Sequence, residues 1–298
     1  MVFLVMRLLP GDPILLYISQ DQYTRLSSAE QVVVLRHLWG LDRPLVLQYV
    51  YWVKDLLHGD LGRSIFLGDT VASEIKRALP ITLHLGITAW IVSHIFGPAA
   101  GIICAVRRGK WSDTVLTVLA NIGVCAPIFW VGVILIYGFG LNLGWMPIQG
   151  YISPFKDFWQ STWHIIMPAF CLALPNIGGS ARLTRSAMLE VIHQDFIRTA
   201  WAKGLRERTV ILRHALRNAI IPVITMAGMS VPQIFGGAVL IEVVFNIPGM
   251  GRLAVNALFS HDYAIVQGNV LIIAVIIVLA NLLVDFSYGW IDPRVRYQ

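Results

Sequence analysis

Residues 263–284 read YAIVQGNVLIIAVIIVLANLLV and contain no Asp, Glu, Lys or Arg. A helix of about 20 apolar residues crosses the ~30 Å hydrocarbon core of a bilayer, and a charged side chain at its centre costs at least about 2.5 kcal/mol. This stretch is therefore predicted to be a membrane-spanning helix. It decides the fold class, since a chain with such a span is an integral membrane protein.

Upstream of it, further charge-free windows long enough to cross a bilayer occur at 78–106, 114–155, 158–181 and 218–241. The sequence thus predicts an all-α integral membrane protein, a polytopic helical bundle with five full spans and a partial first span. Glycine and proline crowd the second half of 114–155, which is interpreted as a loop.

The composition agrees with a membrane protein. Of 298 residues, 56% are hydrophobic and 13% are charged, whereas a soluble domain carries about 25% charged residues. Disordered, collagen-like and disulfide-rich chains are excluded by the same numbers. The cysteines lie in separate apolar runs and are expected to be inert packing residues: Cys104, Cys125 and Cys171.

Residues 1–13 are expected to form the partial first transmembrane helix. As a helix, the residues before Gly11-Asp12-Pro13 reach about 15 Å, half the thickness of the core. We therefore expect either that the natural span begins upstream of Met1 or that the natural subunit has a truncated first helix.

Residues 14–77 contain both signs of charge and no run long enough to span, and are predicted to form an extracytoplasmic helical insert. A capping-box pattern at Ser27 and Glu30 begins one expected helix. A second is expected to begin at Asp42 and Pro44 and to end at Gly59-Asp60-Leu61-Gly62.

The basic residues set the orientation, because Lys and Arg concentrate in cytoplasmic loops. They gather at 107–110, at 182–217 and in the tail 290–298, which are predicted to be cytoplasmic. The net charge of +6 is thereby explained by topology, and no nucleic-acid partner is required. The transmembrane domain is predicted to occupy 78–289.

The segment 182–217 is too polar to span and is predicted to form two helices. Met188, Val191, Ile192 and Phe196 lie on one face of the first. In the second, the apolar face is predicted to contain Leu212, Leu216 and Ile220. Gly204 lies between the two, where a left-handed residue commonly ends a helix.

Specific motifs occur in and around this segment. DFIRTAWAKGL at 195–205 and HALRNAIIPV at 214–223 resemble the EAA loop of ABC importer permeases of the dipeptide/oligopeptide/nickel family. Further blocks resemble that family in the same order: GDP at 11–13, LDRP at 41–44, GDLGRS at 59–64, PGMGRL at 248–253, DY at 262–263 and NLLVDFSYGWIDPR at 281–294.

The resemblance implies a type I ABC importer subunit whose 182–217 loop docks onto a cytoplasmic ATPase. By this resemblance Ala200 is the buried contact and Gly204 the turn, with Asp195, Arg198, Thr199 and Lys203 around them. Trp201 departs from the family pattern, where arginine is more usual. An amphipathic surface hairpin is the alternative interpretation.

The implied partners are a second homologous permease, one or two cytoplasmic ATPase subunits, an extracytoplasmic solute-binding protein and the lipid bilayer. The chain has no Gly-x-x-x-x-Gly-Lys-[Ser/Thr] motif, so ATP and Mg²⁺ are expected on the partner ATPases. No cofactor or catalytic residue is expected on this chain, which is interpreted as a transporter subunit and not an enzyme.

Candidate gate or pathway residues are those that are ionisable or kink a span. Glu242 and Asp285 match family positions near span ends, and Pro127 and Pro175 interrupt spans. A helix-end role for the two acids and a static kink for the prolines are the alternatives. No metal site is expected, because His84 and His94 do not share a helix face.

The function expected from these features is ATP-driven import of di- or oligopeptides across the cytoplasmic (inner) membrane. Nickel chelates, glutathione and oligosaccharides are alternative cargoes of the same machinery. An autonomous secondary transporter or channel is a more distant alternative, which would need ion-coupling acids that the charge-free windows lack.

Overall fold

The computed structural model describes residues 2–8, 14 and 29–291, and in this part of the chain it contains helices and no strands. Predictions made for Gly11-Asp12-Pro13, for Ser27 and for the tail beyond residue 291 lie outside the described residues. Contacts divide the chain into two compact units. The first holds residues up to Ile81 with Pro248–Val275, and the second holds Thr82–Ile247 with the residues from Ile276 onward.

The first unit is built around an apolar cluster shared by helices distant in sequence. The helices of this unit are α1 (Val2–Leu8), α3 (Ala29–Leu38), α4 (Leu45–Leu57), the beginning of α5 (Val71–Val106), α14 (Met250–Phe259) and the beginning of α15 (Tyr263–Ile291). Met6, Val71, Met250 and Ile265 are among the buried residues of the cluster. The beginnings of α5 and α15 pack closely, because a Cβ on Gly268 would lie 2.6 Å from Val71 Cγ1.

The helices α3 and α4 confirm the two helices predicted in the segment 14–77. Pro44 precedes the first residue of α4. At its other end the Gly59 N–H donates to the Leu56 carbonyl at 2.9 Å, and the Asp60 N–H donates to the Asp55 carbonyl at 3.0 Å. This is a Schellman motif, which places Gly59 at φ +80°. The predicted end of the helix at Gly59 is thus confirmed.

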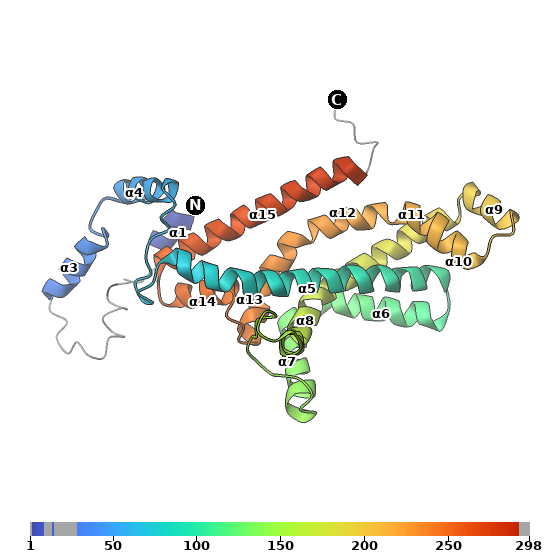
Figure 1. The fold of residues 1–298 in the computed structure, drawn as a ribbon, viewed down its shortest axis with the longest axis horizontal. Coiled ribbons are helices and arrows are strands. Elements are labelled where there is room, and N and C mark those ends of the chain that lie inside the picture. The colour runs from blue at the N-terminus through green and yellow to red at the C-terminus, as the bar shows by residue number, and fades with distance from the viewer. Residues whose placement is uncertain (1, 9–13, 15–28, 292–298) are drawn as a thin grey trace. The chain divides into compact units, whose positions relative to one another are not determined.

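The second unit contains the rest of α5, α6 (Trp111–Cys125), α7 (Ile128–Leu135), the π-helix η1 (Ile136–Asn142) and α8 (Phe158–Ile192). The chain then continues through α9 (Asp195–Ala202), α10 (Glu207–Thr209), the π-helix η2 (Val210–Ala215), α11 (Leu216–Ala219), α12 (Ile221–Met229) and α13 (Val231–Val244). In Figure 1, α5, α6 and α8 run alongside one another toward the end where α9 lies.

Glycines let these three helices approach closely. A Cβ added to Gly101 of α5 would lie 2.5 Å from the Ala181 carbonyl oxygen and 2.6 Å from Thr184 Cβ, both on α8. A Cβ added to Gly178 of α8 would lie 2.7 Å from Val124 Cγ2 on α6 and would overlap the Ala120 carbonyl. Small residues at helix interfaces allow such approach in membrane bundles. We call these α5–α8 and α8–α6 contacts the glycine seam.

Three of the predicted spans are single long apolar helices: Val71–Val106, Phe158–Ile192 and Tyr263–Val284. The helical pair Trp111–Cys125 and Ile128–Asn142 is bent by 108°, and the pair Glu207–Ala219 and Ile221–Met229 by 49°. By length and composition, the described part of the chain therefore has up to 5 spans if each bent pair counts as one.

Two predictions about individual windows are wrong in detail. The window 218–241 is not one helix, because Pro222 and Pro232 each lie in the first turn of a new helix, α12 and α13. Proline suits that position, where its missing N–H costs no intrahelical hydrogen bond. The loop predicted in the second half of 114–155 begins only after Asn142, because η1 includes Gly138 and Gly140.

Candidate functional site: an elbow at the end of α8

The two helices predicted within 182–217 are present in part, because the first is divided between the end of α8 and the separate helix α9. The helix α8 ends at Ile192, and α9 begins at Asp195 after a break at His193 and Gln194. The chain then returns through α10, η2 and α11, as Figure 1 shows in yellow and orange. We call residues 193–215 the elbow.

Gly204 makes the turn of the elbow. Its φ is +74°, and its N–H donates to the Trp201 carbonyl at 2.9 Å. The Leu205 N–H reaches the Ala200 carbonyl at 3.4 Å, which completes a Schellman motif. A Cβ at Gly204 would meet no atom within 4 Å. The requirement for glycine is therefore one of backbone conformation and not of space.

Ala200 lies inside the elbow, 6% exposed. It belongs to an apolar cluster that also contains Met188 of α8, Ile197 of α9 and Ala105 of α5. Val210, Ala215 and Ala219 complete the returning side of the cluster. The small side chain at Ala200 thus lets α9 pack closely on its own neighbours, and the elbow holds its shape through this core.

The outer surface of the elbow mixes charge with apolar area. The polar residues predicted around the turn are all exposed: Asp195, Arg198, Thr199 and Lys203. Arg198 pairs with Asp195 at 3.5 Å, with both side chains largely in solvent, so the pair contributes little to stability. Beside these groups lie large exposed apolar side chains that belong to Phe196, Trp201, Leu205 and Leu212.

Phe196 and Leu212 are predicted from sequence to lie on the apolar faces of their helices, and the structure instead exposes both. Phe196 is 41% exposed, because the break at His193 and Gln194 interrupts the helical period that joined it to Val191. Leu212 is 46% exposed, because the π-helix η2 has a wider turn than an α-helix. The buried residues there are Val210 and Ala215. The π-helical spacing gives no signal in the sequence pattern.

The candidate gate residues lie on four different helices or their ends. Glu242 of α13 is fully buried, and its carboxylate accepts a hydrogen bond from the Thr82 hydroxyl at 2.5 Å. Pro127 caps α7 at the 108° bend, whereas Pro175 lies inside α8 and is partly buried. The side chain of Asp285 in α15 lies outside the described residues.

A loop closes over the end of α13 near Glu242. The Gly150 N–H donates to the Phe245 carbonyl at 3.0 Å, and the Asn246 side-chain amide donates to Gln149 Oε1 at 3.2 Å. Tyr151 in the same loop meets His84 of α5, with 3.1 Å between the hydroxyl and Nδ1. These contacts hold the loop against both α5 and α13.

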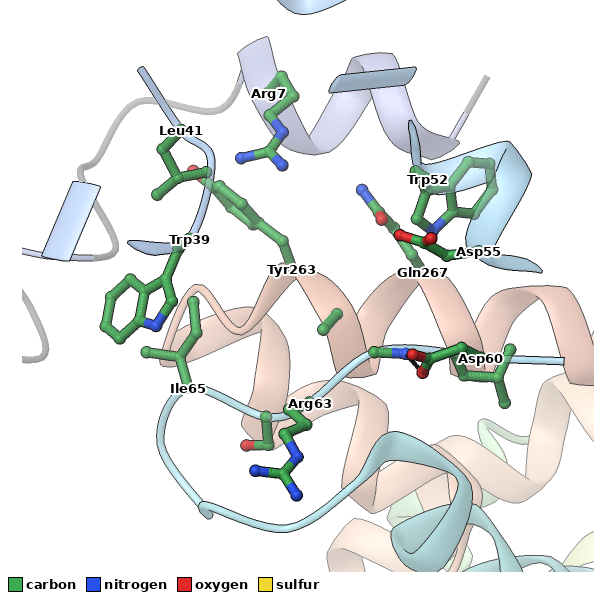
Figure 2. Close-up of a pocket in the computed structure, with 14 residues that line it drawn as sticks. Arg7, Trp39, Leu41, Trp52, Asp55, Asp60, Arg63, Ile65, Tyr263 and Gln267 are labelled. Carbon is green, nitrogen blue, oxygen red and sulfur yellow. Dashed lines mark hydrogen bonds between the residues drawn. The ribbon is translucent and has the colours of Figure 1, made fainter. Parts of the chain in front are cut away.

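The first unit contains a pocket of about 330 Å³. Figure 2 shows the Arg7 guanidinium and the Gln267 amide pointing into it, with Trp52 and Asp55 on one side. The Arg7 guanidinium lies 4.9 Å from the centre of the Tyr263 ring. Among the described residues, Arg7 Nε and Gln267 Nε2 have no hydrogen-bond partner. The pocket therefore combines donors, carboxylates and aromatic walls.

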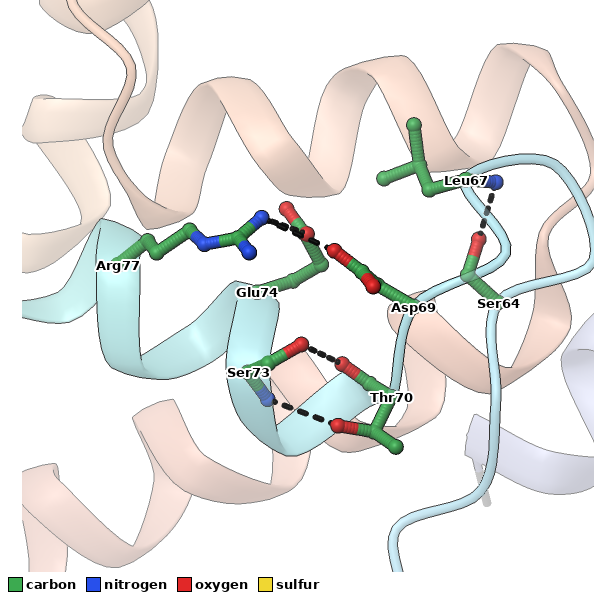
Figure 3. Close-up of polar contacts among 7 residues, drawn as sticks. All are labelled: Ser64, Leu67, Asp69, Thr70, Ser73, Glu74 and Arg77. Atoms are coloured by element: carbon green, nitrogen blue, oxygen red, sulfur yellow. Dashed lines mark hydrogen bonds and ion pairs between the residues drawn. The ribbon is translucent and has the colours of Figure 1, made fainter.

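Two sequence blocks far apart in the chain meet at Ser64, which lines this pocket. The Ser64 hydroxyl donates to the Asp262 carboxylate and accepts from the Leu67 N–H at 2.8 Å. Figure 3 shows Ser64 near the start of α5, where Thr70 Oγ1 accepts from the Ser73 N–H at 3.3 Å. Arg77 bridges Glu74 at 2.8 Å and Asp69 at 3.1 Å in the same view. These contacts fix the beginning of α5.

Comparisons with known proteins agree on one family. The family described as binding-protein-dependent transport system inner membrane component matches residues 97–297. A putative peptide transport system permease protein of Brucella abortus is 42% identical, over 100% of this chain and 93% of the relative. A di/tripeptide transport system permease protein of Pseudomonas aeruginosa is 37% identical, over 100% and 94%.

A glutathione transport system permease protein of Escherichia coli is 39% identical over 100% of this chain and 93% of the relative. Among solved structures, the inward-facing MetNI methionine ABC transporter matches with a TM-score of 0.60 at 16% identity, over 73% of this chain and 96% of that chain. That likeness shows the type I ABC importer fold. The chain therefore belongs to the family of binding-protein-dependent transport system inner membrane components, and it is a permease subunit of an ABC importer.

Proposed function

We propose that this permease moves peptides across the cytoplasmic membrane and that its elbow docks onto a cytoplasmic ATPase. The observation that carries the docking role is the elbow itself, a tightly turned segment with its own apolar core and an outer face of mixed character. Exposed aromatic side chains beside charged ones are typical of protein interfaces. Trp201 and Phe196 supply the aromatic area, and Arg198 and Lys203 supply positive charge.

Peptides are the proposed cargo because relatives matched over the whole chain are named as peptide, di/tripeptide and glutathione permeases. Glutathione is itself a small peptide, so the three names describe one chemical class. Nickel chelates and oligosaccharides find no support in these names. Selection among peptides is expected to depend on the solute-binding protein that delivers them.

The proposed assembly pairs this chain with a second homologous permease, which supplies the other side of the pathway. Cytoplasmic ATPase subunits bind ATP and Mg²⁺ and dock onto the elbow. A solute-binding protein delivers the cargo from outside. In this arrangement ATP hydrolysis moves the elbow, and the two permeases alternate between outward-open and inward-open states.

Substitution of Gly204 tests the docking role. Gly204→Val forces a β-branched residue to φ +74°, which costs about 1–2 kcal/mol and opens the turn. Gly204→Asn is the matched control, because asparagine tolerates this conformation. We expect the valine variant to insert normally but to lose copurification of the ATPase and peptide uptake, and the asparagine variant to retain both.

Equal ATPase binding and uptake by the two variants would contradict the docking role. Uptake of labelled di- and tripeptides by cells that carry the complete importer tests the cargo, with glutathione, a nickel chelate and an oligosaccharide as competitors. Import that continues when the partner ATPase is inactivated would instead indicate a secondary transporter.

A further inference from the structure

An ion pair joins α6 to α8 close to the elbow. Arg185 of α8 donates from Nε and from Nη2 to the two carboxylate oxygens of Asp113 on α6, each at 2.9 Å. Such two-bonded arginine–carboxylate pairs are geometrically specific as well as strong. The Asp113 side chain is 8% exposed and that of Arg185 is 31% exposed, so the pair is partly shielded from water.

The Asp113 carboxylate also holds the turn between α5 and α6. It accepts a hydrogen bond from the Gly109 N–H at 3.0 Å and from the Thr117 hydroxyl at 3.4 Å. Gly109 has a φ of +75°, as the tight turn requires. The Asp113 carboxylate thus connects three parts of the structure, which are the α5–α6 turn, the N-terminal part of α6, and α8.

The position of the pair relates it to the elbow. Arg185 lies about two helical turns before the end of α8 at Ile192. In the glycine seam, a Cβ on Gly101 of α5 would lie 3.1 Å from the Arg185 backbone nitrogen. Ala105 of α5 then enters the elbow's own apolar cluster with Met188 and Ala200. The elbow, α8, α5 and α6 therefore form one closely connected group.

We propose that Asp113 and Arg185 are a positioning pair that transmits movement of the elbow to α5 and α6. This inference rests on the proposed docking role of the elbow. When α8 is displaced by the docked ATPase, the ion pair makes the α5–α6 hairpin move with it, so that the pathway changes state. Without the pair, α8 moves with less effect on its neighbours, and ATP is hydrolysed without import.

The test uses the complete importer in liposomes, with its second permease, ATPases and solute-binding protein. The variants are Asp113→Asn, Arg185→Gln and the two combined, and the readout is the number of peptides imported per ATP hydrolysed. We expect each single variant to lower this ratio roughly tenfold, as loss of a charged hydrogen-bonded pair allows. The double variant is expected to fall no further, because both residues act through one contact.

Arg182→Gln is the matched control. It removes the same charge from an exposed position on α8 one turn earlier, and it is expected to leave the ratio unchanged. A static ion pair would change stability and yield but not the ratio in correctly assembled complexes. Variant complexes that bind the ATPase and keep the wild-type ratio would therefore overturn the proposal.

Arg185→Lys covers the case in which the glutamine variant does not assemble. Lysine keeps the positive charge but cannot donate two bonds in the same plane, so an intermediate ratio is expected and a wild-type ratio would contradict the proposal. Copurification of the ATPase with the wild-type permease is measured alongside. Its absence would overturn the docking role itself, which is a different result from a docked importer with an unchanged ratio.

Discussion

Two adjacent glycines in α8, Gly178 and Gly179, allow the closeness of packing in the glycine seam to be tested by substitution. A Cβ on Gly178 would lie 2.7 Å from Val124 Cγ2 and would overlap the Ala120 carbonyl of α6, whereas a Cβ on Gly179 would meet its nearest atom, Met226 Cε, at 4.0 Å. The Val124 side chain can rotate, but the carbonyl belongs to the backbone. Gly178→Ala must therefore push α6 and α8 apart.

The expected difference in unfolding free energy follows from comparing Gly178→Ala with Gly179→Ala. Each replaces a helical glycine with alanine, so each gains about 1 kcal/mol of helix propensity. Gly178→Ala alone has the overpacking cost, which is about 1–3 kcal/mol and is expected at the upper end because backbone must move. The variants should therefore differ by about 3 kcal/mol, with Gly179→Ala the more stable.

Unfolding of the purified permease in mixed micelles, titrated with sodium dodecyl sulfate and followed by circular dichroism, gives the free energies. Expression and insertion of both variants are checked first, so that the comparison concerns folded protein. Equal stability of Gly178→Ala and Gly179→Ala would refute the close packing of α6 on α8.

Two further predictions concern topology and the buried carboxylate. In a cysteine-free background, an impermeant maleimide added to intact cells should label Leu57→Cys, which is 81% exposed in the protein. It should not label Arg108→Cys or Glu207→Cys. Labelling of either of these two variants would contradict the orientation predicted from basic residues. Thr82→Val removes the hydroxyl that donates to Glu242 and should lower the unfolding free energy by about 1–3 kcal/mol. Thr82→Ser keeps this donor and should lower it less, and equal losses would argue against the hydrogen bond.

The features predicted correctly from sequence are those that depend on local composition. Charge-free windows mark the long helices because desolvation of a charge is costly wherever it occurs in a span. Gly59 and Gly204 mark helix ends because glycine, which has no Cβ, adopts a left-handed backbone at no steric cost. Both effects act at a single position or along one helix, so they can be recognised without knowing the rest of the fold.

The features that sequence reasoning missed depend on contacts distant in the chain or on irregular helices. Asp113 and Arg185 are separated by 72 positions, and neither belongs to a motif, although Asp113 directly precedes a charge-free window. Phe196 was assigned to the wrong face because periodicity assumes an unbroken helix. The same assumption fails for Leu212, since a π-helical turn shifts every later residue around the axis.

The elbow's apolar cluster draws residues from α5, α8 and the returning helices, as well as from α9. A synthetic peptide with the sequence of α9 and its turn would lack those neighbours, and so short a helix is marginal in water. Such a peptide should therefore compete poorly with the permease for the proposed ATPase partner, even though it carries every residue of the block at 195–205. A useful competitor would have to supply a scaffold in place of Met188 and Ala105. For the intact permease the same core means that the proposed association with an ATPase requires little free energy for ordering the elbow.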